Sequence, residues 1–195
     1  METIDLTIDP KKRKIAGEVA STVAMVSFAM LFGTLFMGYA VFRAQQVVWP
    51  PMGLSLPPLF YPTQSTIVIG ISSLFYEGFR HFVERDDLGK AKICLVATLA
   101  FGLAFIFCQV KLWEVLELSG VYHYSGIFGS VVFGYTWIHT AHVVLGISSL
   151  LYLVLPTFFG VLGSANLKSS AGHIGKFWHF LGIVWLIVYL MIFLF

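Results

Sequence analysis

The chain has 195 residues, of which 58% are hydrophobic, 16% aromatic and only 11% charged, and its formal net charge is +2. Because a soluble domain carries roughly a quarter charged residues, this composition excludes an ordinary soluble protein and indicates that lipid surrounds most of the surface. The sequence also lacks a basic stripe interleaved with aromatic residues, which argues against a nucleic-acid partner.

Five apolar segments are long enough to cross a bilayer, which takes about 20 residues. In chain order they cover approximately residues 19–42, 63–82, 93–110, 127–155 and 177–195, and a polar tail at residues 1–16 precedes them. Since lipid offers backbone amides no hydrogen-bond partner, each segment is expected to be an α-helix. The sequence therefore predicts an all-α, polytopic bundle of five transmembrane helices that forms a single membrane domain over residues 1–195.

Prolines separate the first two predicted spans. Trp49, Pro50 and Pro51 follow the first apolar segment, and further prolines stand at positions 57, 58 and 62. A helix cannot continue through so many residues that lack an amide hydrogen, so an ordered interfacial loop is expected here. For the same reason, Pro156 is expected to mark the end of the fourth span.

The distribution of basic residues orients the spans. With the N-terminus in the cytoplasm, only Arg43 and Lys111 fall in external segments. The ten basic residues in cytoplasmic segments are Lys11, Lys12, Arg13, Lys14, Arg80, Arg85, Lys90, Lys92, Lys168 and Lys176. Because basic residues concentrate on the cytoplasmic side of membrane proteins, we expect the N-terminus inside and the C-terminus outside.

Two histidines lie on one face of the fourth span. His139 and His142 are three residues apart, and neutral imidazole is a common metal or haem ligand. A zinc site needs three or four ligands, however, and no Cys, Asp or Glu lies near them at a comparable depth. Tyr135, Trp137 and Val143 leave little room for a haem. We therefore favour two buried imidazoles that hydrogen-bond to neighbouring helices.

Trp178 and His179 stand near the expected inner end of the last span. Both side chains have an apolar body and a polar edge, which suits the aromatic belt at the membrane interface. Contact with lipid headgroups is an additional role expected for them there.

Two motifs in the last two spans resemble signatures of a known family. The fourth span contains HTAHVVLG from His139 to Gly146, and the last contains WHFLGIVW from Trp178 to Trp185. The patterns HxxHVxxG and WHFxxxxW, in this order and at this separation, resemble subunit III of the haem–copper terminal oxidases. Trp49 with its two following prolines is similar to that family's WPP.

The third span ends in a further match and in departures from the family. Gln109 and Trp113 match Q-x-x-E-W, but Leu112 stands where the family commonly has Glu. Phe28 likewise follows a serine where S-E is typical, and Gly182 replaces the Asp of WHFVD. Two acidic residues, Glu114 and Glu117, are expected in the outer loop as part of a hydrated rim.

The resemblance implies the short, five-helix bacterial form of subunit III, an accessory subunit without redox centres. It would lie in the bacterial inner membrane beside catalytic subunit I, with subunit II and small subunits as further partners. Haems and copper would belong to these partners, and structural phospholipids would bind in a cleft. The complex would be a proton-pumping oxidase using cytochrome c or quinol, and this chain would support assembly and sustained proton uptake. The residues assigned structural or lipid-contact roles are Trp49, Gln109, Trp113, His139, His142, Trp178, His179 and Trp185.

Three alternatives account for part of the pattern. A membrane cytochrome b would bind haem through His139 or His142 together with His179, and a Soret band of the isolated chain would reveal it. A related accessory subunit of a nitric oxide reductase would differ in its partner. A small transporter would need a polar path, but Arg, Lys, Asp and Glu are absent from the deep interior of the predicted spans.

Overall fold

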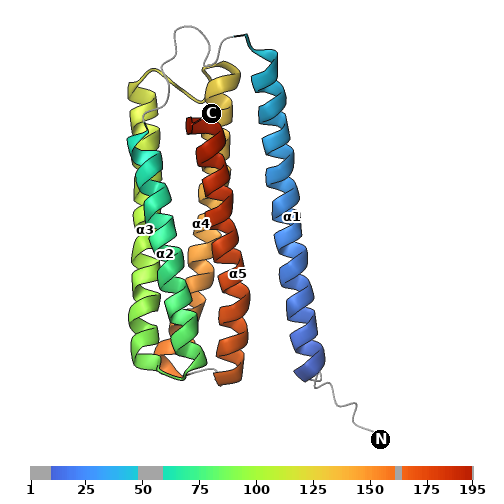
Figure 1. Ribbon diagram of the computed structural model, residues 1–195, viewed down its shortest axis with the longest axis vertical. Coiled ribbons are helices and arrows are strands. Elements are labelled where there is room, and N and C mark those ends of the chain that lie inside the picture. The colour runs from blue at the N-terminus through green and yellow to red at the C-terminus, as the bar shows by residue number, and fades with distance from the viewer. Residues whose placement is uncertain (1–9, 48–58, 161–163, 195) are drawn as a thin grey trace, which may run out of the picture.

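The computed structural model describes residues 10–47, 59–160 and 164–194. These described residues form five long α-helices and no β-strand (Figure 1). The helices are α1 (Pro10–Gln45), α2 (Phe60–Glu84), α3 (Leu88–Leu118), α4 (Gly126–Phe159) and α5 (Ser164–Tyr189), and a π-helical turn (Leu190–Leu194) extends α5. The all-α architecture predicted from the apolar segments is confirmed.

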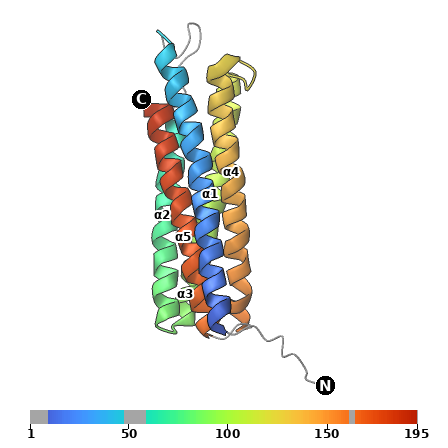
Figure 2. The same cartoon turned by 90° about the vertical axis from the view of Figure 1, so that its right-hand side faces the viewer.

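The helices run side by side along the long axis of the molecule (Figures 1 and 2). The most extensive contact is between α2 and α3, while α5 packs against both α2 and α4, and α3 packs against α4. α1 stands at the edge of this group and contacts mainly α4 and α5. Most of its surface is therefore left open to lipid or to a partner.

Among the described residues, four helical stretches are long and apolar enough to cross a membrane. They are Ile15–Gln45, Leu88–Leu118, Gly126–Phe159 and Asn166–Leu194. α2, whose last two turns carry Glu77, Arg80 and Glu84, is not one of them. The span expected at residues 63–82 lies within α2, and both this crossing and the orientation of the termini stay predictions.

The C-terminal ends of α3 and α4 differ from the sequence expectation. α4 continues past Pro156 to Phe159, although the proline lacks the N–H that would donate one backbone hydrogen bond of the helix. Gly160 ends the helix instead, with a φ of 63° in the left-handed region that favours glycine. Glu114 and Glu117 are not in a loop, since α3 extends to Leu118.

α5 begins before the span expected at residue 177. Its first turns run beside the short connection between α2 and α3, where Lys168 forms an ion pair of 2.9 Å with Asp86. The next residue, Asp87, caps α3 by accepting a hydrogen bond of 3.2 Å from the backbone N–H of Lys90. These contacts set the lower end of the bundle.

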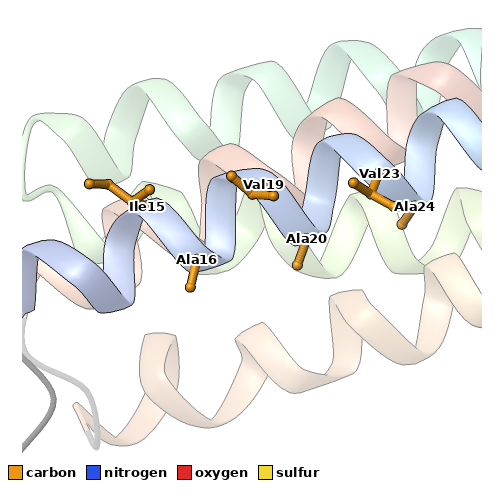
Figure 3. A pocket seen from close by; sticks show the side chains of 6 residues that line it. All are labelled: Ile15, Ala16, Val19, Ala20, Val23 and Ala24. Atoms are coloured by element: carbon orange, nitrogen blue, oxygen red, sulfur yellow. The ribbon is translucent and has the colours of Figure 1, made fainter.

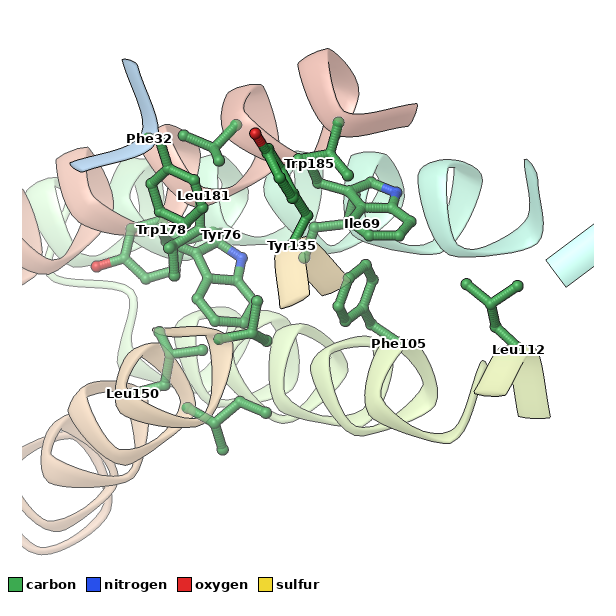
Figure 4. Close-up of a cluster of buried hydrophobic side chains, with 14 of the residues drawn as sticks. Phe32, Ile69, Tyr76, Phe105, Leu112, Tyr135, Leu150, Trp178, Leu181 and Trp185 are labelled. Carbon is green, nitrogen blue, oxygen red and sulfur yellow. The ribbon is translucent and has the colours of Figure 1, made fainter. Parts of the chain in front are cut away.

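The largest side chains of the buried core are mostly aromatic, and several of them are shown in Figure 4. The largest fully buried side chains are Trp178, Trp185 and Tyr76. In contrast, the described side chains of α1 that are buried are Phe32 and Tyr39. The core is therefore built by α2 to α5, and α1 contacts it along a narrow strip.

Candidate functional site

The two C-terminal motifs pack against each other across the α4–α5 interface. The ring centroids of His139 and Trp185 lie 5.3 Å apart. A Cβ atom at Gly146 would lie 2.9 Å from the indole of Trp178. Seven residues separate the two positions in each motif, and the helices are antiparallel, so the contacts lie two turns apart along one seam. HxxHVxxG and WHFxxxxW therefore form the two sides of one interface.

Trp178 fills the space between α5 and its neighbours α3 and α4. Its side chain is fully buried, and a Cβ atom at Gly102 would lie 3.1 Å from the ring. Glycine at residues 102 and 146 thus lets the indole approach both helices. The expectation that Trp178 belongs to the interfacial aromatic belt is wrong, because the register of the helices turns its side chain into the core.

His139 is enclosed by aromatic rings. It is fully buried, and the ring centroids of Phe32 and Phe105 lie 6.1 and 5.7 Å away in edge-to-face arrangements. Neither imidazole nitrogen has a hydrogen-bond partner among the described residues. The expected hydrogen bond to a neighbouring helix is therefore not formed, because the surrounding side chains are apolar rings.

His142 bonds within its own helix rather than to a neighbour, which also corrects the expectation. Its Nδ1 donates a hydrogen bond of 2.7 Å to the carbonyl of Ile138. The imidazole then lies edge-to-face against Phe28 of α1, with ring centroids 4.6 Å apart, and 5.4 Å from Phe32. The position at which the family typically has a carboxylate is thus in direct contact with the second histidine of HxxHVxxG.

Three of the residues singled out in the sequence donate side-chain hydrogen bonds to other helices. The donor and acceptor pairs are Gln109 Nε2 to Ser65 Oγ at 3.0 Å, Trp113 Nε1 to Thr136 Oγ1 at 3.0 Å, and Trp185 Nε1 to Thr66 Oγ1 at 3.1 Å. Such interhelical bonds contribute on average about 0.6 kcal/mol each in membrane proteins. Together they tie α2 to α3 and α5, and α3 to α4.

His179 pairs with a carboxylate to which sequence reasoning did not connect it. Its Nε2 lies 3.1 Å from Oε1 of Glu77, and the other Glu77 oxygen lies 2.9 Å from the guanidinium of Arg80. The exposed fractions of the Glu77 and His179 side chains are 47% and 30%. The one feature of the sequence that pointed to this contact is that Glu77 and His179 both stand near the predicted inner ends of their spans. Only the packing of α2 on α5 shows that they meet.

Within the described ranges no metal centre is formed, and His139 and His179 do not face one another as paired haem ligands would. No group of three or more His, Cys, Asp or Glu side chains in the described part of the chain could hold a metal ion. His139 packs beside Trp185, which is about 9 Å along α5 from His179 and about 120° around its axis. The two histidines therefore face different surroundings, and His179 is already engaged by Glu77.

Of the other two positions at which family carboxylates are replaced, packing accounts for Leu112 but not for Gly182. Leu112 is fully buried among the apolar side chains of the core. A Cβ atom at Gly182 would meet Ser73 Oγ at 3.5 Å, which is an ordinary contact. Trp49, which matches the WPP pattern, lies outside the described residues.

A groove of about 560 Å³ lies between the C-terminal part of α1 and the N-terminal part of α4. Tyr39 and Tyr135 line the groove, and the hydroxyl of each donates a hydrogen bond to a backbone carbonyl. Tyr39 donates to Met191 at 2.8 Å, and Tyr135 donates to Leu35. The groove is thus apolar in character although two tyrosines line it.

Comparison with known proteins agrees with the resemblance noted in the motifs. The family model of cytochrome c oxidase subunit III matches residues 18–195. The cytochrome c oxidase subunit 3 of Thermostichus vulcanus is 26% identical over 172 residues, which cover 88% of this chain and 84% of that protein. A probable cytochrome c oxidase subunit 3 of Mycobacterium tuberculosis is 29% identical over 176 residues, covering 90% of this chain and 86% of that protein.

A third relative combines two subunits in its name. The haem–copper oxidase subunit I+III of Aeropyrum pernix is 25% identical over 176 residues, which cover 87% of this chain and 22% of that protein. These similarities do not favour a nitric oxide reductase subunit or a membrane cytochrome b.

Proposed function

Because the chain belongs to the cytochrome c oxidase subunit III family and is an accessory subunit of a haem–copper oxidase, we propose that it holds no redox centre and acts by supporting the catalytic subunit. Oxygen reduction then takes place on haems and copper of the partner subunits. This chain contributes assembly, bound phospholipid and sustained proton uptake.

The observation that carries this proposal is the contact between the two family motifs. His139 and Trp185 meet by their rings, and Trp178 fits against Gly146. The motif residues thus act on one another and hold α4 to α5, with His139 closed off by Phe32 and Phe105. A structural role accounts for this arrangement without any bound group.

Proton uptake is supported indirectly in this proposal. Residues 19–42 contain no acidic side chain. Phe28 stands where the family typically has Glu, and its ring packs against His142 and Phe177. Since residues 19–42 offer no carboxyl group, the subunit acts by packing beside the catalytic subunit's proton-uptake site and by keeping the lipid around that site ordered.

The exposed apolar surface of α1 supports a large membrane partner. Met30 and Met37 have exposed fractions of 67% and 68%, and the relative from Aeropyrum pernix bears the name of subunit I together with subunit III. We propose catalytic subunit I as the main partner, with subunit II and small subunits beside it. The assembly lies in the bacterial inner membrane with the N-terminus of this chain in the cytoplasm.

Co-purification and removal of the subunit test the proposal. An affinity tag on this chain should recover the catalytic subunit with its haems, whereas the chain purified alone should show no Soret band. Oxidase that lacks the chain should begin at a comparable rate and then inactivate after fewer turnovers. A tagged chain that recovers no haem-containing partner, or an unchanged number of turnovers without it, would contradict the proposal.

A further inference from the structure

Two buried polar atoms on neighbouring helices lack a hydrogen-bond partner. They are the amide oxygen of Gln109 on α3 and the hydroxyl oxygen of Thr140 on α4, and neither is paired within the described part of the chain. The nitrogen of the same amide donates to Ser65, so turning the amide over would leave the nitrogen unpaired instead. Because buried polar atoms are nearly always hydrogen-bonded, each oxygen requires a partner that the surrounding side chains do not supply.

Two contacts fix the register between α3 and α4. Trp113 of α3 donates a hydrogen bond to Thr136 of α4, and a Cβ atom at Gly102 of α3 would lie 3.4 Å from the side chain of Ile147 of α4. Both contacts fit the same antiparallel register. In this register, each residue nearer the start of α3 lies beside one residue further along α4.

This register places the two unpaired atoms at one level of the bundle. Gln109 stands four residues before Trp113, and Thr140 stands four residues after Thr136. Four residues are about one helical turn, so each residue keeps the helix face of the hydrogen-bonded residue from which it is counted. Gln109 and Thr140 therefore lie level with each other at the α3–α4 interface.

The occupant that fits these two atoms is a water molecule. An amide and a hydroxyl are neutral, and no hydrogen bond joins them directly, so the link between them must be a small neutral molecule that both donates and accepts. A buried water needs about two to four polar partners, and these two atoms meet the minimum. A hard cation is a poorer occupant, because it takes about six or more oxygen ligands.

Neighbouring parts of the molecule differ from this interface. His139 precedes Thr140, but its imidazole lies among the rings of Phe105 and Trp185. The face of α1 shown in Figure 3 carries aliphatic side chains, which offer a water molecule no hydrogen bond, namely Ile15, Ala16, Val19, Ala20, Val23 and Ala24. The α3–α4 interface differs from both in presenting two unpaired polar atoms at one level.

We propose that one buried water molecule bridges Gln109 and Thr140 and thereby links α3 to α4. The water donates a hydrogen bond to the amide oxygen and accepts one from the threonine hydroxyl. Gln109 belongs to the Q-x-x-E-W pattern, and Thr140 lies within HxxHVxxG at a position that this signature does not specify. The inference goes beyond the proposed function and does not depend on it, because it needs only the packing of α3 on α4.

A structure of the full chain, alone or in its complex, at a resolution that shows ordered water provides the direct test. A water peak should lie about 2.6–3.2 Å from both the Gln109 amide oxygen and the Thr140 hydroxyl oxygen. Thr140→Val keeps the shape of the side chain but removes the hydroxyl, so the peak should disappear. Thr140→Ser keeps a hydroxyl and should retain the peak.

A double-mutant cycle measures the strength of the link. Gln109→Met also breaks the bond to Ser65, but that loss is the same in either background and cancels. The substitution should lower the folding equilibrium constant about threefold more in the unaltered chain than in Thr140→Val, which is the size of an average interhelical hydrogen bond in a membrane. Ser148→Ala is the matched control, since this exposed hydroxyl of the same helix bonds to Val144. It should show no coupling to Gln109→Met.

The proposal is overturned by a direct hydrogen bond between Gln109 and Thr140, by the absence of a water peak between them, or by a peak that persists in Thr140→Val or is lost in Thr140→Ser. Equal effects of Gln109→Met in the unaltered chain and in Thr140→Val, or coupling of the same size to Ser148→Ala, would overturn it as well. None of these outcomes bears on the proposed function, which is tested by recovery of the catalytic subunit.

Discussion

The indole of Trp178 occupies the space that a side chain at residue 146 would need. A Cβ atom on Gly146 would lie 2.9 Å from the six-membered ring of Trp178, closer than carbon atoms ordinarily approach. The final glycine of one family motif is thus explained by the first tryptophan of the other. This relationship makes the α4–α5 interface sensitive to single methyl groups.

Gly146→Ala should therefore destabilise the subunit by about 1–3 kcal/mol, the usual cost of overpacking a close-packed interior. Gly134 is the matched control, since it lies in the same helix and a Cβ there would meet nothing within 4 Å. Thermal unfolding of the two variants in the same detergent provides the measurement. Equal unfolding temperatures would show that Trp178 has room to move away.

His139→Phe should preserve the stability of the chain or raise it. The imidazole has no hydrogen-bond partner among the described residues, so an apolar ring of similar size keeps the contacts with Phe105 and Trp185 and removes two unpaired nitrogens. His139→Ala should instead cost about 2–5 kcal/mol by leaving a cavity. A marked loss of stability in His139→Phe would reveal a polar partner for this imidazole.

His142→Ala should weaken assembly with the catalytic subunit and leave the haem spectrum of the assembled oxidase unchanged. The imidazole fills the contact between α4 and Phe28 of α1, so its removal loosens the position of α1. The recovered ratio of this chain to the catalytic subunit measures the effect. A changed haem spectrum in the assembled enzyme would contradict a packing role.

Phe28→Glu should create a site for dicyclohexylcarbodiimide, which modifies protonated carboxyl groups in apolar surroundings. The new carboxyl group would lie beside His142, where Phe28 now packs at 4.6 Å, and the charged form is costly in such an environment. The unaltered chain has no acid between residues 19 and 42. Mass spectrometry should find label at residue 28 of the variant, and label between residues 19 and 42 of the unaltered chain would count against the alignment.

The cap of α3 should weaken in acid. Hydrogen bonding to the Lys90 side chain lowers the pKa of Asp87 below its ordinary value of 3.8, and the two side chains lie 3.0 Å apart. A lowered native pKa means that the carboxylate stabilises the fold above pH 3.8 and loses this effect as the pH falls through the native pKa. The protection of the Lys90 amide against hydrogen exchange, relative to the intrinsic exchange rate at each pH, should therefore fall in the unaltered chain as Asp87 is protonated, and should change less in Asp87→Asn.

Much of the architecture follows from local sequence. Hydropathy over about 20 residues predicts helices wherever lipid is the solvent, because the backbone must satisfy its own hydrogen bonds there. The all-α bundle and the family, both expected from the apolar segments and the two motifs, are confirmed. Helix ends were less predictable, since Gly160 rather than Pro156 ends α4.

Sequence by itself determined that this chain is a helical membrane protein of the subunit III family, because composition, periodicity and motif spacing are properties of contiguous residues. The tertiary structure alone decided which side chains meet. It turned Trp178 inward against Gly102 and Gly146, left the imidazole of His139 among rings, and brought His179 to Glu77, 102 positions away along the chain. Such contacts depend on the register between helices that are distant in sequence, and that register is set by the fit of large and small side chains across the whole bundle.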